Sequence, residues 1–328
     1  MGCVGWNVPL ERPWNAPGTS WTAPSGLPPP LDPNAFKEIA KALFGVGTLW
    51  QIRLVSMNTV NHEPLDPQSA LGDVHIERHG DVSVIVLNRP PHNFLDVTFL
   101  TAIVDALESS QHSSRALVIA SSGKSFCAGA NFTSGSQLDP SSADKDFQSQ
   151  ARSLYRQAER LFRVEIPIIC ALDGPAVGAG LGIALACDII VMGKDTWMSA
   201  NFVKLGIHPG FAISHTLGLR IGPGKASEML LTGKRVTSVE AMELGLIDRL
   251  VGSGNAKQSA LEIALEIAKA APLAVSKTRA TLRSGLADQA ARAMEREVVA
   301  QAELVTTQDC FEGISAMLTK REPRFEGR

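Results

Sequence analysis

Paired cysteines, long apolar runs and an excess of charge of one sign are all missing from this 328-residue sequence. Its five cysteines are an odd number and form no Cys-x-x-Cys pair, which argues against a disulfide framework and against a zinc site. No apolar run is as long as a membrane span, which needs about 18 residues. Basic and acidic residues number 31 and 33, so we expect no surface for nucleic acid or anionic lipid. These absences favour a reducing, intracellular compartment.

The composition is that of a globular protein with a substantial core, since 45% of the residues are hydrophobic and 20% are charged. Residues 1–73 differ from the rest, because eight prolines fall within the 25 residues from Pro9 to Pro33. Proline fixes φ and removes a hydrogen-bond donor, so we expect a flexible N-terminal extension. A short amphipathic helix over residues 34–44 is the one regular element expected there.

The pattern changes at Val74, where predicted strands begin to alternate with predicted helices. Strands are expected over 74–78, 82–87, 116–120, 168–172 and 189–192, and helices over 97–109, 147–162 and between the last two strands. This alternation predicts an α/β fold with right-handed crossovers. After Thr237 the chain is expected to be almost wholly helical to Lys320. We therefore expect a core over 74–255 and a helical oligomerisation region over 256–328.

Two turns rich in small residues follow predicted strands. The first spans residues 123–131, and the second spans residues 173–182 and opens a helix. Small residues let a ligand approach the backbone, and the first N–H groups of a helix are unsatisfied and carry partial positive charge. Two such groups that converge on one point would stabilise an enolate or a tetrahedral oxyanion. Tight packing of strand against helix explains either turn equally well when it is considered alone.

Taken together, the motifs of this chain resemble the crotonase superfamily, the enoyl-CoA hydratase/isomerase family. The resemblance covers residues 74–328, and many motifs occur in the same order. They are Leu87-Asn-Arg-Pro90, Ser125-Phe-Cys-Ala-Gly-Ala130, Gly174-x4-Ala179-Gly-Leu-Gly-Ile-Ala-Leu-Ala-Cys-Asp188, Leu205-Gly-Ile-His-Pro-Gly210, Leu231-Thr-Gly233, Ala241-x3-Gly245-Leu-Ile and Glu312-Gly-x7-Arg321-x-Pro-x-Phe325.

The resemblance implies a spiral of ββα repeats followed by a helical trimerisation region, assembled as a trimer or a dimer of trimers. It implies an acyl-CoA thioester as substrate, no metal, and no cofactor beyond the coenzyme A that the substrate carries. The backbone N–H groups of Ala130 and Ala179 would form the oxyanion hole. The residues that match positions for coenzyme A binding are Ala128, Gly129, Asn131, Phe132, Lys320 and Phe325.

The chain departs from the hydratases of this family at both catalytic glutamates. The first stands three residues beyond the second oxyanion residue, and here that position is Gly182. The second stands four residues before the glycine of the Leu-Gly-x-x-Pro motif, and here that position is Phe202, which would line the acyl site. Adding water to an enoyl group needs a base and an acid, and neither residue can serve as one.

His208 is the strongest replacement for proton transfer, because it lies in the loop that borders the acyl pocket in the family and because histidine is the side chain best matched to proton transfer near neutral pH. A structural histidine bonded to the backbone is the alternative. Other polar candidates are weaker: Ser199, Ser214 and the only tyrosine, Tyr155, are possible pocket groups. Cys127 is expected to be a small buried residue, and Asp188 is expected to be structural.

The sequence therefore predicts an acyl-CoA-processing enzyme of the hydratase/isomerase type with an altered set of proton-transfer groups. Decarboxylation stays open, because the loss of CO₂ itself generates the enolate and needs only an oxyanion hole and a proton donor. A non-catalytic protein that binds CoA esters stays open too. The expected location is the cytoplasm, with the mitochondrion as the alternative.

Overall fold

This computed structural model describes residues 70–130 and 143–328, all of which belong to one compact unit, Pro64–Arg328. The expected N-terminal extension with its helix over 34–44 lies outside the described residues, as do Asn131 and Phe132.

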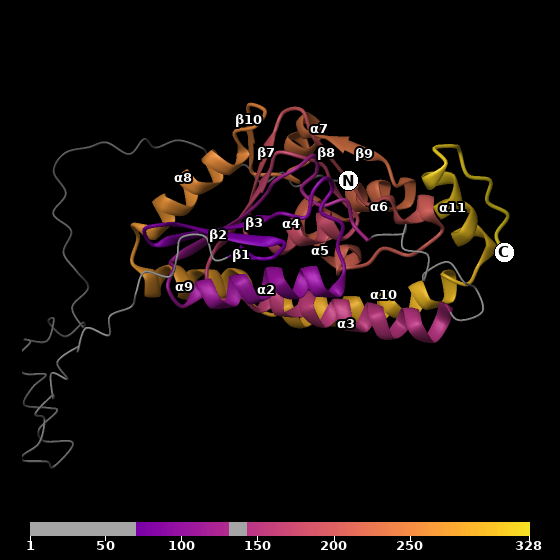
Figure 1. Cartoon of the computed structure of the whole chain (residues 1–328), viewed down its shortest axis with the longest axis horizontal. Helices are drawn as coiled ribbons and strands as arrows, with labels where there is room; N and C mark the ends of the chain where they lie inside the picture. Colours follow the sequence, from indigo (N-terminus) through magenta and orange to yellow (C-terminus); the bar gives the residue numbers. More distant parts are fainter. Residues whose placement is uncertain (1–69, 131–142) are drawn as a thin grey trace, which may run out of the picture. The chain divides into compact units, whose positions relative to one another are not determined.

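A seven-stranded sheet forms the centre of this unit (Figure 1), in the order β1-β2-β3-β4-β5-β7-β10. The pairs β1/β2 and β2/β3 are antiparallel, and every later pair is parallel. The strands are β1 (Ala70–Leu71), β2 (Val74–His79), β3 (Val82–Leu87), β4 (Ala116–Ser121), β5 (Ile168–Leu172), β7 (Ile189–Gly193) and β10 (Arg249–Val251). The alternation of strands and helices predicted from the sequence is confirmed, and the first two predicted strands form the antiparallel pair β2/β3.

Three further strands form a small second sheet in the order β6-β8-β9, and helices connect and cover the strands. The small-sheet strands are β6 (Ala176–Val177), β8 (Trp197–Ser199) and β9 (Arg235–Thr237). The helices are α2 (Val97–Gln111), α3 (Ala143–Arg163), α4 (Ala179–Ala186), the 3-10 helix η2 (Asn201–Leu205), α5 (Ile213–Ile221), α6 (Pro223–Thr232), α7 (Ser238–Glu243), α8 (Ala256–Ala268), α9 (Pro272–Leu282), α10 (Leu286–Leu304) and α11 (Gln308–Leu318).

Both faces of the central strands β3, β4, β5 and β7 are buried, and alternate residues of these strands enter different apolar clusters. In β3, Ile85 and Leu87 belong to the larger cluster, which also includes residues of α2, α3 and α10. Val84 points the other way, into a smaller cluster completed by α8. Figure 1 shows α8 on one side of the strands and α2, α3 and α10 on the other. Double burial explains why the central strands are continuous apolar runs.

The C-terminal third differs from the expectation in one respect. Residues after Thr237 are mainly helical, as predicted, but β10 interrupts them and adds a parallel strand beside β7. At three residues the strand is too short to produce a periodic apolar signal; Arg249 is exposed, and the other two residues are only partly buried.

Two aspartates repeat one device at the start of the parallel strands. Asp188 precedes β7, and its carboxylate accepts a hydrogen bond of 2.8 Å from the N–H of Ile168 at the start of β5. Asp248 precedes β10, and its carboxylate accepts a 2.7 Å bond from the N–H of Ile190 in β7. Each aspartate also donates its own N–H to the carbonyl of that same residue. The device fixes the register where each parallel pair begins.

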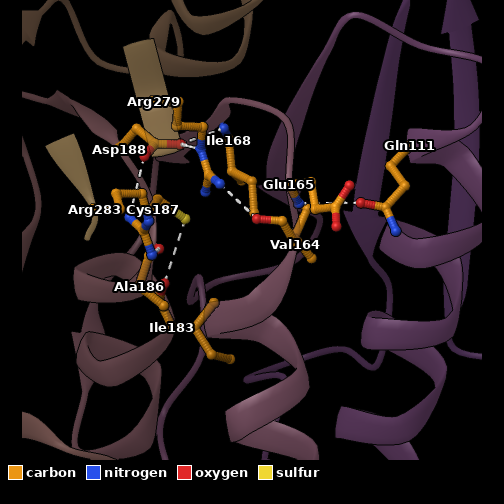
Figure 2. Close-up of polar contacts among 10 residues, drawn as sticks. All are labelled: Gln111, Val164, Glu165, Ile168, Ile183, Ala186, Cys187, Asp188, Arg279 and Arg283. Carbon is orange, nitrogen blue, oxygen red and sulfur yellow. Dashed lines mark hydrogen bonds and ion pairs between the residues drawn. The ribbon is translucent and has the colours of Figure 1, made fainter. Parts of the chain in front are cut away.

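Asp188 also joins the sheet to the C-terminal helices through two arginines (Figure 2). Arg279 Nε donates to Asp188 over 2.8 Å, and Arg283 Nη1 donates over 3.1 Å. Arg279 Nη1 also donates to the carbonyl of Val164, and Arg283 Nη2 donates to that of Ala186. All three charged side chains are at most 19% exposed, and burial lowers the pKa of Arg283. The expectation that Asp188 is structural agrees with these contacts.

We expect Asp188→Asn to lower the free energy of unfolding by about 3–5 kcal/mol, because it leaves two buried guanidinium groups without a counter-charge. Urea unfolding followed by circular dichroism measures the loss. The matched control is Asp288→Asn, which breaks the exposed pair with Arg163 and should cost less than about 1 kcal/mol. Equal losses for the two variants would contradict a central role for Asp188.

Candidate active site

The turn after β4 is held by a buried asparagine from another part of the chain. Asn93 is fully buried, and its side-chain nitrogen donates to the carbonyls of Ser122 and Ser125 over 2.9 Å each and to that of Phe126 over 3.1 Å. Its side-chain oxygen accepts from the N–H of Arg89 over 2.7 Å. Four hydrogen bonds to one amide therefore fix the approach to residues 128–130.

The second turn is joined directly to the first. Val177 N–H donates to the Cys127 carbonyl over 3.0 Å, and Cys127 N–H donates to the Pro175 carbonyl over 3.3 Å. The two turns are so close together that no side chain fits between them at Gly174 or Gly180. A Cβ on Gly180 would lie 2.2 Å from the Cys127 carbonyl oxygen, and one on Gly174 would lie 2.8 Å from the Cα of Ser125. Glycine at these positions is required by close approach.

This contact brings the two predicted oxyanion residues into the same region. Gly129 has a positive φ of 83°, and a Cβ built on it would lie 3.7 Å from the amide nitrogen of Ala179. Ala179 is the first residue of α4, so its N–H has no partner within the helix. Neither the Ala130 nor the Ala179 N–H donates a hydrogen bond within residues 70–130 and 143–328.

Aromatic rings lie beside the first turn of α4, and one of them is Phe202, which with Gly182 stands where the resemblance to the hydratases would place the two glutamates. A Cβ on Gly182 would lie 2.5 Å from Cδ1 of Phe211, whose ring is buried. Phe202 is 9% exposed in η2, and its Cζ lies 3.7 Å from the position of a Cβ on Gly178. Neither position holds an acid or a base.

His208 is half-buried in the loop that follows η2. Its Nδ1 lies 2.7 Å from the carbonyl oxygen of Pro209. A carbonyl only accepts, so Nδ1 carries the proton and the neutral ring keeps the lone pair on Nε2. The carbonyl of His208 in turn accepts from Nε2 of Gln301 over 2.9 Å. The main chain therefore holds this imidazole in a tautomer that can accept a proton.

The remaining polar candidates are occupied by structural contacts. Burial raises the pKa of the Cys127 thiol to about 12, so a thiolate nucleophile is disfavoured. Ser199 Oγ donates to the carbonyl of Lys234 over 3.2 Å. Tyr155 donates to Gln301 over 2.9 Å and is buried. The expectation that Cys127 is a small buried residue agrees with its complete burial.

The predicted coenzyme A residues divide into two groups. Ala128 and Gly129 lie in the first turn, beside the proposed oxyanion amides. Lys320 and Phe325 lie in the C-terminal tail, where Lys320 has a positive φ of 55° and Phe325 is 43% exposed. The tail is held to α11 by contacts such as the pair between Arg321 and Glu312, which lowers the pKa of that carboxyl to about 2.

Glu297 is a buried carboxylate that the sequence analysis did not identify. It accepts from the N–H of Ala212 over 2.7 Å and from the N–H and Oγ of Ser214 over 3.1 and 2.6 Å. Burial raises its pKa, and these hydrogen bonds oppose the rise. A signal was present, because Glu297 falls at helical spacing among the buried residues of α10. These are Ala290, Ala293, Met294, Val298, Gln301 and Ala302.

No helix in the described ranges has the length and apolar character that a membrane crossing requires. Within the same ranges, no three His, Cys, Asp or Glu side chains gather in a way that could hold a metal ion.

Comparison with known proteins supplies the context for this geometry. The family model described as enoyl-CoA hydratase/isomerase matches residues 77–328. A 2,3-dehydroadipyl-CoA hydratase of Escherichia coli (strain K12) is 32% identical over 263 residues, which cover 79% of this chain and 100% of that protein. The mitochondrial enoyl-CoA hydratase domain-containing protein 2 of Mus musculus is 31% identical over 255 residues, which cover 75% of this chain and 85% of that protein.

A solved structure shares the fold as well. The enoyl-CoA hydratase/isomerase from Pseudoalteromonas atlantica T6c superposes with a TM-score of 0.68 at 28% identity, covering 77% of this chain and 100% of that one. The expected α/β crotonase-type fold is therefore confirmed. Since the relatives come from bacteria and from a mitochondrion, the compartment stays a prediction.

We expect Gly180→Ala to destabilise the protein by about 1–3 kcal/mol or more, because the added methyl overlaps the Cys127 carbonyl. Thermal unfolding measures the effect. Gly218→Ala is the matched control, since Gly218 also lies within a helix and a Cβ there would meet nothing within 4 Å. That change should be neutral or stabilising by up to about 1 kcal/mol. Similar behaviour of both variants would disprove the close contact of the two turns.

Proposed function

Because the chain belongs to the enoyl-CoA hydratase/isomerase family, we propose that it processes an acyl-CoA thioester at the two convergent turns. The N–H groups of Ala130 and Ala179 bind the thioester oxygen. The observation that supports this role is that the two amides lie in the same region of the molecule, since Gly129 closely approaches the start of α4. Neither amide has a partner among the described residues. No side chain is needed for this function.

The proposed oxyanion hole lowers the energy of an enolate. Negative charge that develops on the thioester oxygen is met by two N–H dipoles that are already in place, so no reorganisation is required. Ala179 adds the partial positive charge of a helix start, although α4 is short. Any reaction that passes through a thioester enolate is served by this arrangement.

The altered proton-transfer set limits which reaction follows. With Gly182 and Phe202 in place of the two family glutamates, water has no carboxylate beside it to accept its proton. His208 is the proton-transfer group of the proposal, because its Nδ1 bond to Pro209 leaves Nε2 free to accept a proton when neutral and to donate one when charged.

Substrate binding and assembly complete the proposal. Ala128 and Gly129 line the path of the pantetheine chain together with Asn131 and Phe132, which lie outside the described residues. Lys320 and Phe325 contact the nucleotide end, and both are exposed as that role requires. No cofactor is needed beyond the coenzyme A of the substrate. A trimer or a dimer of trimers is proposed for the region 256–328, where Leu273 and Leu282 are each 81% exposed on one helix.

Decarboxylation is the second candidate reaction, and the two rings favour it. When a carboxyl group on the α-carbon leaves as CO₂, the enolate forms without a base. The site then needs only the oxyanion hole and one proton donor, and the buried rings of Phe202 and Phe211 have no basic group that could activate water. A non-catalytic protein that binds CoA esters is the remaining alternative.

We expect Ala179→Pro to lower kcat by about 10²–10³, the usual effect of losing one oxyanion donor. Proline is tolerated at the first position of a helix, so the change removes the N–H with little effect on α4. Steady-state kinetics with the acyl-CoA that turns over measures the loss. Ala179→Gly keeps the N–H and should retain activity, and a fully active proline variant would refute the oxyanion role.

We expect His208→Ala to lower kcat by about 10²–10⁴ and to leave the binding of CoA esters unchanged. The assay uses crotonyl-, malonyl- and methylmalonyl-CoA, and His79→Ala on an exposed strand end is the control. Wild-type hydration of crotonyl-CoA at the rate of a two-glutamate hydratase would contradict the interpretation of Gly182 and Phe202. Binding without turnover on all three substrates would favour the non-catalytic alternative.

A further inference from the structure

The loop between η2 and α5 contains two consecutive residues in a conformation that side chains disfavour. Phe211 and Ala212 both have φ of 60° and neither is glycine. A left-handed conformation of this kind is maintained only when surrounding contacts hold it. Ala212 is also the N-cap of α5 and provides no side-chain hydrogen bond to that helix. The contacts that maintain the turn must therefore come from elsewhere.

They come from α10. Glu297 is fully buried, and it accepts the N–H of Ala212 over 2.7 Å and both donors of Ser214. Gln301, one turn further along α10, donates to the His208 carbonyl over 2.9 Å. Two side chains of one helix thus hold both ends of the loop 208–214. The carboxylate also satisfies amides at the start of α5, where negative charge is favoured.

The turn determines where the Phe211 ring lies. Its Cδ1, Cγ and Cβ would lie 2.5, 2.7 and 2.8 Å from a Cβ on Gly182. Residues 179 and 182 are three apart in α4 and lie on the same face of the helix. The ring therefore fills the space in which any side chain at position 182 would begin, on the face that also presents Ala179.

We propose that Phe211 determines acyl specificity at this site and that Glu297 is the positioning residue that holds its ring against Gly182. The proposal rests on the function proposed above, because it assumes that an acyl group lies beside Ala179. Phe211 then gives the acyl site an apolar wall, which suits unbranched hydrocarbon α- and β-carbons. The same ring excludes a side chain at position 182, so restoring a carboxylate there requires a second change at residue 211.

A double-mutant cycle on stability tests the positioning role. Gly182→Ala alone should lower Tm, because the methyl overlaps the held ring. In the Glu297→Gln background the ring can yield, so the loss of Tm caused by Gly182→Ala should be smaller by about 2–4 °C. The control cycle pairs Glu297→Gln with Gly180→Ala, whose Cβ meets Cys127, and it should be additive. Additivity in both cycles would overturn the positioning role.

Ligand binding supplies the readout that a purely structural role would not move. Calorimetry measures the affinity for butanoyl-CoA and for free CoA. In Glu297→Gln the affinity for butanoyl-CoA should fall by about tenfold, and the affinity for free CoA should be unchanged. Equal weakening of both ligands would overturn the specificity role. Ser214→Ala removes one donor to Glu297 at an exposed residue and should shift the same ratio less, so it replaces Glu297→Gln if that variant does not fold.

The two proposals fail in different ways. If the wild-type protein binds neither butanoyl-CoA nor free CoA, the proposed function fails. The stability cycle needs no ligand, so it still decides whether Glu297 holds Phe211 against Gly182.

Discussion

The close contact between two backbone turns is the constraint on which the rest of this structure depends. Gly174 and Gly180 let the segment after β5 lie directly against the segment after β4, and hydrogen bonds through Cys127 join them. Because the strands before the turns are parallel in one sheet, though separate in sequence, their ends meet at the same edge. Under the proposed function, the site is made of main-chain amides, and such a site tolerates alanine at positions 130 and 179.

A backbone site and a side-chain site differ in how readily they change. The amides of residues 130 and 179 persist under almost any substitution, whereas acid–base groups are lost in one step. At positions 182 and 202 this chain has glycine and phenylalanine, and Phe211 occupies the space that glycine leaves. Under the proposed function, the site retains its means of stabilising an enolate while its proton chemistry depends on a histidine held by the main chain.

Much of the fold could be predicted from the sequence because the central strands are buried on both faces and read as unbroken apolar runs. Strands of two or three residues, such as β6 and β10, could not be predicted. They are too short to show a periodic apolar pattern and are defined only by their pairing with neighbouring strands. The two turns were predicted from their small residues and family motifs. The side chains that hold the turns were not predicted. Asn93 donates a hydrogen bond to the carbonyl of Ser125, which lies more than thirty positions away in the sequence, and no local sequence pattern indicates such a contact.

Glu297 is a second case in which the sequence does not identify a contact, although here the sequence does indicate that a contact exists. An acidic residue among buried positions of a helix is costly unless donors meet it, so the pattern of α10 predicts a partner without identifying one. The partners are amides of a left-handed turn 83 and 85 positions away. That pairing connects the C-terminal helices to the face of α4 that presents Ala179. Helix α10 belongs to the region expected to mediate assembly, and through Glu297 it contacts the turn that carries Phe211. A change in the packing of α10 would therefore shift the position of the Phe211 ring in the proposed acyl site.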